Sequence, residues 1–368
     1  MPDQISSIGA TGDHTTIADW EAATDIALTS GEVTYGLCQD QNFTAGATIA
    51  GATGQNSTTY RVLMADDGTF GEAGSDQGFK AHVSGSDPLR ADNTKGACVT
   101  VDGGTTALSI DESYARIQRM QCINTTTAYS PLMTIINGNT DPLITQCIVY
   151  QQADFYGSDY CIEAFGGHIS NCLCYVGENI TVTGTHGGIR TWYGTQRLYF
   201  NTVLNPTSDT DVKNGISNAN ISGAQIYKCN LVMEFNTKDF AEAANPTYTW
   251  DYNGCSDTSL TDPTTGDDPH PVENIAYNTS TGGSNLGITA TGASGNLDAK
   301  LKSGSACESQ GTDLSSETSS WLDSALKLDV DIIDTARHAT TPTIGCWEIA
   351  AAGGGITAGS LGLLGVGI

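Results

Sequence analysis

The chain has 368 residues, and its 41 acidic against 15 basic side chains give a formal net charge of −26. Such an excess of negative charge argues against nucleic-acid binding and against docking on anionic membranes, because both depend on clustered Lys and Arg. The 43 glycines and the low share of charged residues, 15%, are typical of a turn-rich β-protein and not of a helical one.

A short amphipathic helix is expected within residues 1–30. Asp13 to Thr16 supply helix N-cap side chains, and the segment 17–26 spaces its apolar residues as one helix face requires. The first residues have no basic region followed by an apolar run, so no signal peptide is predicted.

A short phrase then recurs along residues 98–278, in which an apolar residue is followed three positions later by Cys or Asn. Taken from Cys122 onward, successive Cys or Asn positions differ by 25, 25, 29, 28, 24 and 25 residues. The copies are Ile144–Cys147, Ile169–Cys172, Leu198–Asn201, Ile226–Cys229, Trp250–Asn253 and Ile275–Asn278.

A period in the twenties, made of strand-length runs between Gly, Asn, Asp and Thr, is typical of a solenoid built from β-coils. Helical repeats are usually longer and need apolar residues at 3.6 spacing, which this stretch lacks. The sequence therefore predicts a parallel β-helix, with coils over residues 31–296 and a cap over 1–30. An end cap is needed because the last coil of a solenoid exposes its core and its open strand edges.

Phrases near both ends resemble the right-handed parallel β-helix proteins of the pectate-lyase-like superfamily. Residues 8–23 are similar to its opening strand and capping helix, and residues 301–307, 331–337 and 344–348 are similar to its closing segment. Cys307 and Cys346 depart from the usual residues there. The resemblance implies an all-β right-handed fold with residues 297–349 as the last coils. It does not indicate an activity, because the superfamily includes lyases, hydrolases, adhesins and phage tailspikes.

Eleven cysteines are present, with no Cys-x-x-Cys spacing. Cys122, Cys147, Cys172 and Cys229 fall at one repeat position, where a small apolar residue suits an inward ladder. Buried free thiols are therefore expected, which suits folding in a reducing cytoplasm. No metal site or cofactor is predicted.

The last residues, 350–368, are uncharged and rich in glycine. Their length approaches that of a membrane span, but Leu and Ile are few and no basic residues flank the run, so no membrane insertion is predicted. We expect an assembly tail that packs on a partner subunit. Its apolar anchors would be Ile356, Leu361, Leu363, Leu364 and Ile368.

Chemistry on a β-helix is expected on an outer sheet face, where neighbouring coils could pair two carboxylates for glycoside cleavage. The candidate carboxylates show no common offset that would define a pair, so solvated turn residues are the simpler interpretation. They are Asp154, Asp159, Glu163, Glu178, Asp209 and Asp211. His168 and His186 have no acidic partner at the spacing of a catalytic triad, and the acidic segment Asp257–Pro271 is expected to be a solvated loop.

The segment Arg190–Tyr193 is the strongest binding candidate. Strand alternation places Arg190 and Trp192 on one face, and an aromatic ring beside a guanidinium makes a platform for sugar rings. Tyr199, on the adjoining strand, would extend it. The same pair equally fits a cation–π contact at a subunit interface.

Three function classes follow. The first is a non-enzymatic phage virion surface protein, a tailspike, fibre or head decoration, that folds in the host cytoplasm. Its expected partners are two further copies of the chain in a homotrimer, other virion proteins and a host-surface glycan. The second is a polysaccharide lyase or glycoside hydrolase. The third is a bacterial surface adhesin.

Overall fold

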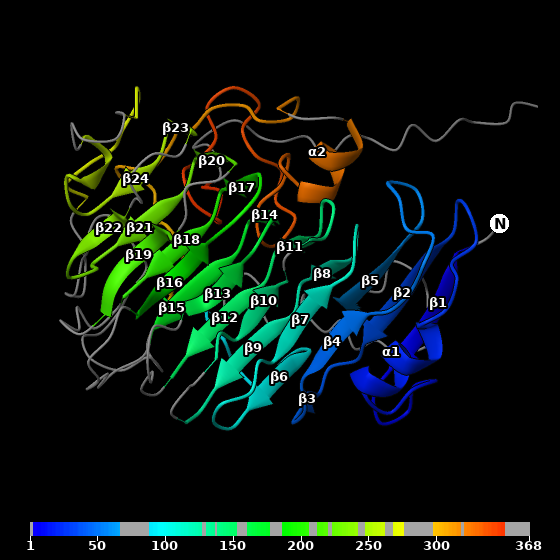
Figure 1. Cartoon of the computed structure of the whole chain (residues 1–368). Coiled ribbons are helices and arrows are strands. Elements are labelled where there is room, and N and C mark those ends of the chain that lie inside the picture. The colour runs from blue at the N-terminus through cyan, green and yellow to red at the C-terminus, as the bar shows by residue number, and fades with distance from the viewer. Residues whose placement is uncertain are drawn as a thin grey trace, which may run out of the picture.

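The computed structural model describes residues 3–66, 88–126, 130–136, 138–152, 160–176, 186–205, 212–219, 223–241, 247–261, 268–275, 297–317 and 320–349. In these residues the chain winds into a parallel β-helix in which successive coils, except at the two ends, add one strand to each of three sheets (Figure 1). Strands pair in parallel with the coils before and after them. The prediction of an all-β parallel solenoid with little helix is confirmed.

The three sheets follow one another around the coil. Sheet 1 contains β1 (Gln4–Ile8), β2 (Val33–Cys38), β5 (Tyr60–Ala65), β8 (Arg116–Gln118), β11 (Leu143–Thr145), β14 (Gly167–Ser170), β17 (Gln196–Tyr199), β20 (Ala224–Lys228) and β23 (Thr247–Asp251). Sheet 2 contains β3 (Asn42–Phe43), β6 (Cys98–Val101), β9 (Gln121–Asn124), β12 (Ile148–Gln151), β15 (Leu173–Val176), β18 (Thr202–Leu204), β21 (Leu231–Met233) and β24 (Gly254–Cys255). Sheet 3 contains β4 (Ala47–Ala50), β7 (Leu108–Asp111), β10 (Met133–Ile135), β13 (Tyr160–Ala164), β16 (His186–Thr191), β19 (Val212–Asn218) and β22 (Lys238–Ala241).

The corner between sheets 1 and 2 explains the recurring sequence phrase. In six successive coils two residues join the strands, and the first of them has a left-handed backbone. A single left-handed residue reverses the chain sharply enough to change sheets, at a steric cost for any residue except glycine. These left-handed residues are Arg119, Gln146, Asn171, Phe200, Cys229 and Tyr252.

Asparagines stack at the second corner position of the last three coils. The Asn201 backbone N–H donates to Oδ1 of Asn230 at 3.1 Å, and the Asn230 N–H donates to Oδ1 of Asn253 at 3.0 Å. Asp268 ends the row by accepting from the Asn253 N–H at 2.9 Å. Each side chain thus satisfies a buried backbone donor of the coil before it, which burial would otherwise penalise.

The cysteines do not all occupy that corner position. Cys147 and Cys172 do, but Cys229 is itself the left-handed residue, and Cys122 lies within β9, paired with Val149. The prediction of one four-cysteine row was therefore wrong in two places, because coil lengths vary and shift the phrase by one or two residues. All eleven cysteines are buried free thiols, as expected.

The N-terminal cap is helix α1 (Ile17–Thr24), which packs across the first coil. Thr16 is the N-cap and accepts from the Asp19 N–H at 3.0 Å. Trp20 is fully buried against Gly36, where an added Cβ would lie 2.5 Å from the indole ring. The cap predicted for residues 1–30 is present, although β1 already belongs to sheet 1.

Aspartates close the other end of the solenoid. The N–H of Asp239 in β22 donates to Asp257 at 2.9 Å, and Asp268 accepts from both Tyr252 and Asn253. Asp268 is only 2% exposed, and a 3₁₀ turn, η1 (Ser259–Thr261), packs on β22. The expectation of a solvated loop over Asp257–Pro271 was therefore wrong for Asp257 and Asp268, because the open edge needs acceptors for its free N–H groups; residues 262–267 lie outside the described part of the chain.

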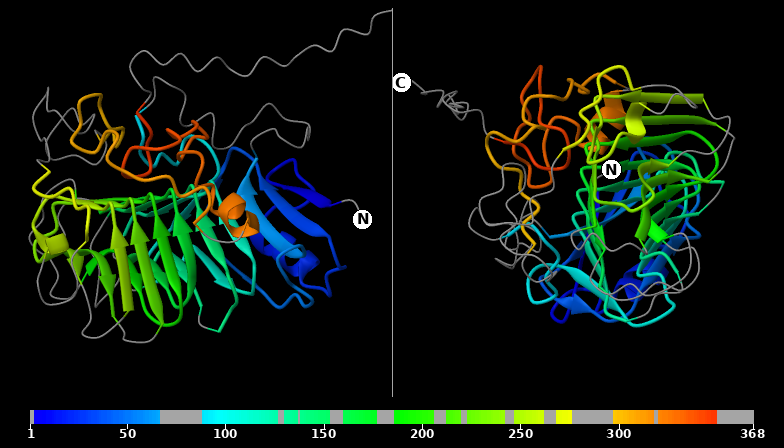
Figure 2. Two further views of the ribbon diagram at one scale, coloured as in Figure 1. Left: turned by 90° about the horizontal axis from the view of Figure 1, so that it is seen from above. Right: turned by 90° about the vertical axis from the view of Figure 1, so that its left-hand side faces the viewer.

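Residues 297–349 do not add further coils, contrary to prediction. Their described part contributes no strand to the three sheets and crosses the outside of the stacked strands (Figure 2). Helix α2 (Ser320–Leu326) lies over β11 and β14. Leu314, Leu322 and Leu326 form a second apolar core with the outer side chains of sheet 1.

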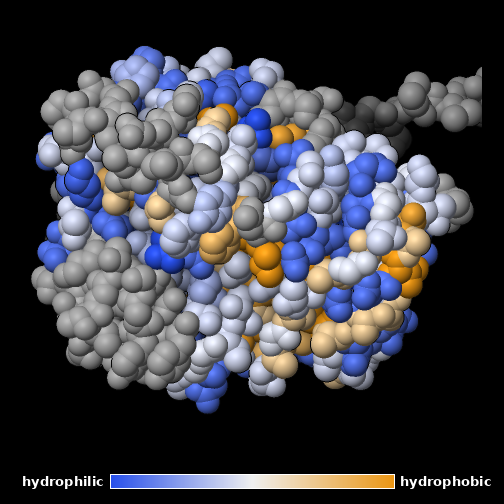
Figure 3. Space-filling view, viewed as in Figure 1, coloured by the Kyte–Doolittle hydropathy of each residue, from blue (hydrophilic) through white to orange (hydrophobic). Residues whose placement is uncertain are grey.

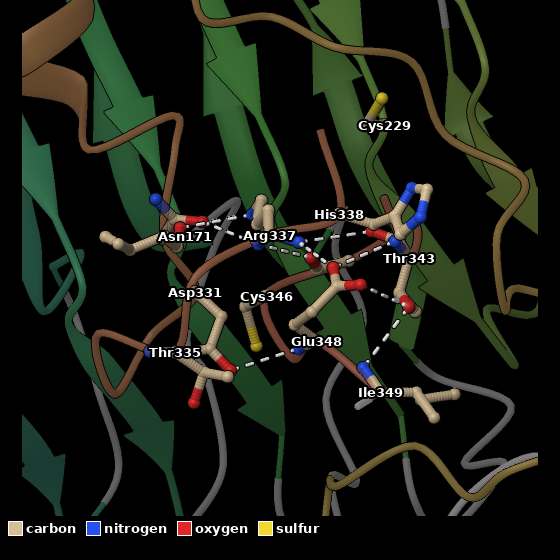
Figure 4. A network of polar contacts seen from close by, with 12 residues as sticks. Asn171, Cys229, Asp331, Thr335, Arg337, His338, Thr343, Cys346, Glu348 and Ile349 are labelled. Carbon is tan, nitrogen blue, oxygen red and sulfur yellow. Dashed lines mark hydrogen bonds and ion pairs between the residues drawn. The ribbon is translucent and has the colours of Figure 1, made fainter. Parts of the chain in front are cut away.

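A buried arginine holds this C-terminal segment together (Figure 4). Arg337 donates to Glu348 at 3.3 Å and to Oδ1 of Asn171 at 2.8 Å, and its guanidinium lies 3.8 Å from the centre of the Phe200 ring. Asp331 accepts from the Glu348 N–H at 3.1 Å. The Asp331–Arg337 and Ile344–Glu348 phrases of the sequence are thus the two halves of one ionic clasp.

The face shown in Figure 3 is mostly hydrophilic, and apolar colour gathers towards the N-terminal end, around α1 and the first strands. No helix in the described part of the chain is long and apolar enough to cross a membrane.

Candidate functional site

The outer face of sheet 3 carries the segment that the sequence singled out. In β16, Ile189 and Thr191 are fully buried and point into the coil. Arg190 and Trp192 alternate with them on the outer face and are partly exposed. Tyr193 follows at the end of the strand with 37% of its surface exposed.

Glu163, on the neighbouring strand β13, organises these side chains. It pairs with Arg190 in the strand register, and one carboxylate oxygen, Oε1, accepts three hydrogen bonds. The donors are Nε of Arg190 at 2.8 Å, Nη2 of Arg190 at 2.5 Å and the indole N–H of Trp192 at 2.6 Å. Both charged groups are largely shielded from water, so this ion pair is stronger than a solvent-exposed one.

Aromatic rings surround the ion pair. The Trp192 ring is stacked with Phe165 at 5.5 Å with nearly parallel planes, and Tyr193 lies 6.1 Å from Trp192. The Arg190 guanidinium lies 4.5 Å from the Trp192 ring centre and 4.8 Å from that of Tyr160. We call Glu163, Phe165, Arg190, Trp192 and Tyr193 the aromatic platform.

Tyr199 does not belong to the platform. It lies in β17 of sheet 1, is fully buried, and packs with Leu314 and Leu326 of the C-terminal segment. The prediction that it extends the platform was wrong. Strand β17 follows β16 along the chain but belongs to the next sheet of the coil, so Tyr199 lies on a different face.

The sequence indicates Glu163 and Arg190 as separate candidates and does not predict that they form a pair. The available signal was their separation of 27 positions, which is about one coil, so that equivalent positions of neighbouring coils become neighbours in space. Phe165, two residues after Glu163 on the same face, was missed for the same reason.

Of the six candidate carboxylates, Glu163 is the one that falls in the described part of the chain. The side chains that contact it there, Arg190 and Trp192, are both donors. Cleavage of a glycosidic bond needs two carboxyl groups that flank the bond, and the described platform offers one. The other five lie outside the described residues; they are Asp154, Asp159, Glu178, Asp209 and Asp211.

His168 has an acidic partner that the sequence did not reveal. Its Nε2 lies 3.0 Å from Oδ1 of Asp141, which precedes it by 27 positions. Burial lowers the pKa of His168, and the hydrogen bond from His168 lowers the pKa of Asp141. Ser170, two residues away, bonds to Thr145 and to the Leu326 carbonyl instead, so the pair has no hydroxyl nucleophile there. The side chain of His186 lies outside the described part.

A compact acidic cluster lies at the C-terminal end, where ligand atoms of Asp239, Cys255 and Asp257 are within 4.8 Å of one another. The Asp239 oxygens already accept from the Phe235 N–H at 3.0 Å and from the N–H and hydroxyl of Ser256 at 2.6 Å each. Burial raises the pKa of Asp239 to about 7 and raises that of Cys255. These bonds fit an edge-capping role, because Asp239 accepts from backbone N–H groups at the open end of the sheets.

A polar hollow of about 300 Å³ lies over sheet 2, between residues 90–93 and the side chains of Ile123, Tyr150 and Gln152. Tyr150 forms its floor but is only 6% exposed and stacks on Tyr175 at 4.3 Å. The hollow thus lacks the open ring face that the aromatic platform offers.

The apolar anchors predicted for the tail lie outside the described residues. Comparison of the chain with protein-family models, with curated proteins and with solved structures finds no match. The solenoid fold therefore rests on the structure, and membership of the pectate-lyase-like superfamily stays a prediction.

Proposed function

We propose that this chain is a non-enzymatic surface protein of a phage virion, a tailspike, fibre or head decoration, that holds a host-surface glycan on the aromatic platform. The carrying observation is the cluster of Trp192, Tyr193 and Phe165 around the Glu163–Arg190 ion pair on an outer sheet face. Aromatic faces cover the apolar C–H surface of a sugar ring, and fixed polar groups beside them orient its hydroxyls.

The non-enzymatic part of the proposal follows from the chemistry of Glu163. Glycoside cleavage uses two carboxyl groups, one on each side of the bond. Glu163 is the one carboxyl group of the described platform, and its position is held by three hydrogen bonds to Oε1. This arrangement favours a rigid recognition surface over a catalytic group.

The platform is tested by measuring the binding of purified full-length protein to a panel of surface polysaccharides. Trp192→Ala should weaken binding about tenfold or more, as truncation of a central aromatic contact does. Trp347→Ala is the matched control, because Trp347 is also half-buried beside a cation, Lys300 at 5.1 Å, but on the C-terminal segment. Equal effects of the two substitutions would reject the platform.

A reducing-end assay on every bound polysaccharide separates the two main function classes. We expect no release of reducing ends. Steady release by the wild type, lost in Glu163→Gln, would replace the proposal with the alternative of a polysaccharide-degrading enzyme. That alternative would draw its second carboxyl group from the acidic residues in the segments before β13, β16 and β19, which lie outside the described part of the chain.

The virion role includes assembly, for which we propose a homotrimer held by the tail of residues 350–368. The solution mass of the full chain is compared with that of a version ending at Glu348. A full chain that is a trimer and a truncated version that is a monomer would support assembly through the tail. If both versions are monomers, the proposed trimer is rejected. Labelling of purified particles with antibodies against the chain tests the virion location directly.

A further inference from the structure

The charges of the aromatic platform cancel. Within β13, β16 and β19, the charged side chains that the structure describes are Glu163 and Arg190, and they form one ion pair. The two side chains are shielded from solvent to a similar extent, with 13% of Glu163 and 15% of Arg190 exposed. The platform therefore presents no net charge to a ligand, while the chain as a whole carries −26.

The ion pair also sets which hydrogen bonds a ligand can make. Oε1 of Glu163 takes all three donors, so the other oxygen, Oε2, keeps its acceptor capacity towards the described surroundings. Arg190 uses Nε and Nη2 on Glu163, which leaves the N–H groups of Nη1 as donors. An acceptor and a donor side by side match a sugar hydroxyl, which both donates and accepts.

The neighbouring coil carries a small, exposed residue beside Trp192. In the strand register Arg190 is followed by Ser217, and the Trp192 position is followed by Ala219, whose N–H donates to the Thr191 carbonyl as that of Trp192 does to Ala164. Ala219 is exposed. Ser217 is buried, so the open position is that of Ala219, where a sugar ring beside Trp192 would meet only a methyl group.

We propose that the ligand of the platform is a neutral oligosaccharide, made of sugars without carboxylate, sulfate or phosphate groups; this inference rests on the proposed function. An anionic sugar would find Arg190 already neutralised by Glu163. It would also approach a chain with a large negative charge, which slows and weakens the association of anions. A neutral sugar loses nothing to either effect.

The test uses acidic bacterial polysaccharides, each paired with its own carboxyl-reduced product, in which every uronic acid has become a neutral hexose. Wild-type protein should bind the neutral member of a pair, and its Kd should change by less than about twofold between 50 and 500 mM NaCl, since salt screens only charge–charge attraction. Preference for the acidic member, with binding that weakens in salt, would overturn the inference while leaving the platform intact. Failure to bind any polysaccharide would instead count against the proposed function.

Two substitutions sharpen the test. Glu163→Gln keeps acceptors for Arg190 and Trp192 but leaves the guanidinium charge uncompensated, so binding should shift towards the acidic member of each pair. Arg190→Gln should weaken binding of the neutral member without that shift. An unchanged preference in Glu163→Gln, in a protein with wild-type thermal unfolding, would show that the ion pair does not set ligand charge.

Discussion

The outer faces of sheets 1 and 3 are built on the same coils, but the C-terminal segment covers the first, whereas the second keeps partly exposed side chains. On sheet 1, Thr145 and Ser170 bond to the Leu326 carbonyl, and Tyr199 is buried beneath the C-terminal segment. On sheet 3, the equivalent outward positions carry the Glu163–Arg190 pair and the partly exposed Trp192. The same stacked coils support both faces, and the two faces differ in that the C-terminal segment packs on the outward side chains of sheet 1.

The difference also separates stability from binding. The covered face contributes apolar burial and buried polar bonds, which the fold depends on. The platform contributes one ion pair and partly exposed rings on the outer face, so its loss should affect the proposed glycan binding more than folding. Three predictions, in order of decreasing effect, test this separation.

The largest effect is expected at the clasp of the covered face. Arg337→Ala leaves Glu348 buried without its cation and removes the contact with Phe200, so the free energy of unfolding should fall by about 3–5 kcal/mol, as for other broken buried pairs. Urea unfolding measures the loss, and limited proteolysis should show earlier cleavage within residues 297–349.

The double substitution Arg337→Met with Glu348→Leu is the matched control, because it removes both charges and keeps apolar volume. It should recover part of the lost stability. A loss below about 1 kcal/mol in Arg337→Ala would mean that the clasp does not hold the segment on sheet 1.

A smaller effect is expected at Asp239, at the end of sheet 3, and it should depend on pH. Burial raises the pKa of Asp239 to about 7 from an ordinary value of 3.8. Between these two values the folded chain keeps a proton that the unfolded chain releases, so the contribution of Asp239 to stability is present at low pH, falls as the pH rises from about 4 to 7, and then levels off.

Thermal unfolding of wild type and Asp239→Asn across pH 4–8 isolates this group, because the other carboxylates are shared by both proteins. The free energy of unfolding of the wild type should fall relative to that of Asp239→Asn as the pH rises through that window, because Asn does not titrate. A difference that is constant with pH would show that Asp239 titrates normally.

The smallest effect on stability is expected at the platform itself. Trp192→Ala removes a partly exposed ring, so the free energy of unfolding should change by about 1 kcal/mol or less, although the proposed glycan binding should weaken about tenfold or more. A larger loss of stability, comparable with that of Arg337→Ala, would indicate that Trp192 is buried in the assembled protein, as the subunit-interface interpretation of the Arg190–Trp192 pair requires.

Patterns within short stretches of the sequence determined the β-coil repeat, the capping helix and the outward direction of the Arg190 and Trp192 side chains. Strand-length apolar runs between turn residues predicted the β-coils, because a solenoid rung needs only short-range alternation and a turn at each corner. The N-cap at Thr16 and the amphipathic spacing after it predicted α1. Alternation within one strand placed Arg190 and Trp192 together on the outer face of β16, since it involves no other coil.

Tertiary structure alone decided what depends on neighbouring coils. Coil lengths vary, so the register between coils could not be counted from one phrase, and Cys122 and Cys229 left the expected row. Which sheet a residue joins depends on that register, and for this reason Tyr199 lies on the covered face. The partners Glu163 for Arg190 and Asp141 for His168, each 27 positions away, and the return of residues 297–349 across the coils are long-range contacts. Such contacts depend on the three-dimensional path of the chain, which local sequence patterns do not encode.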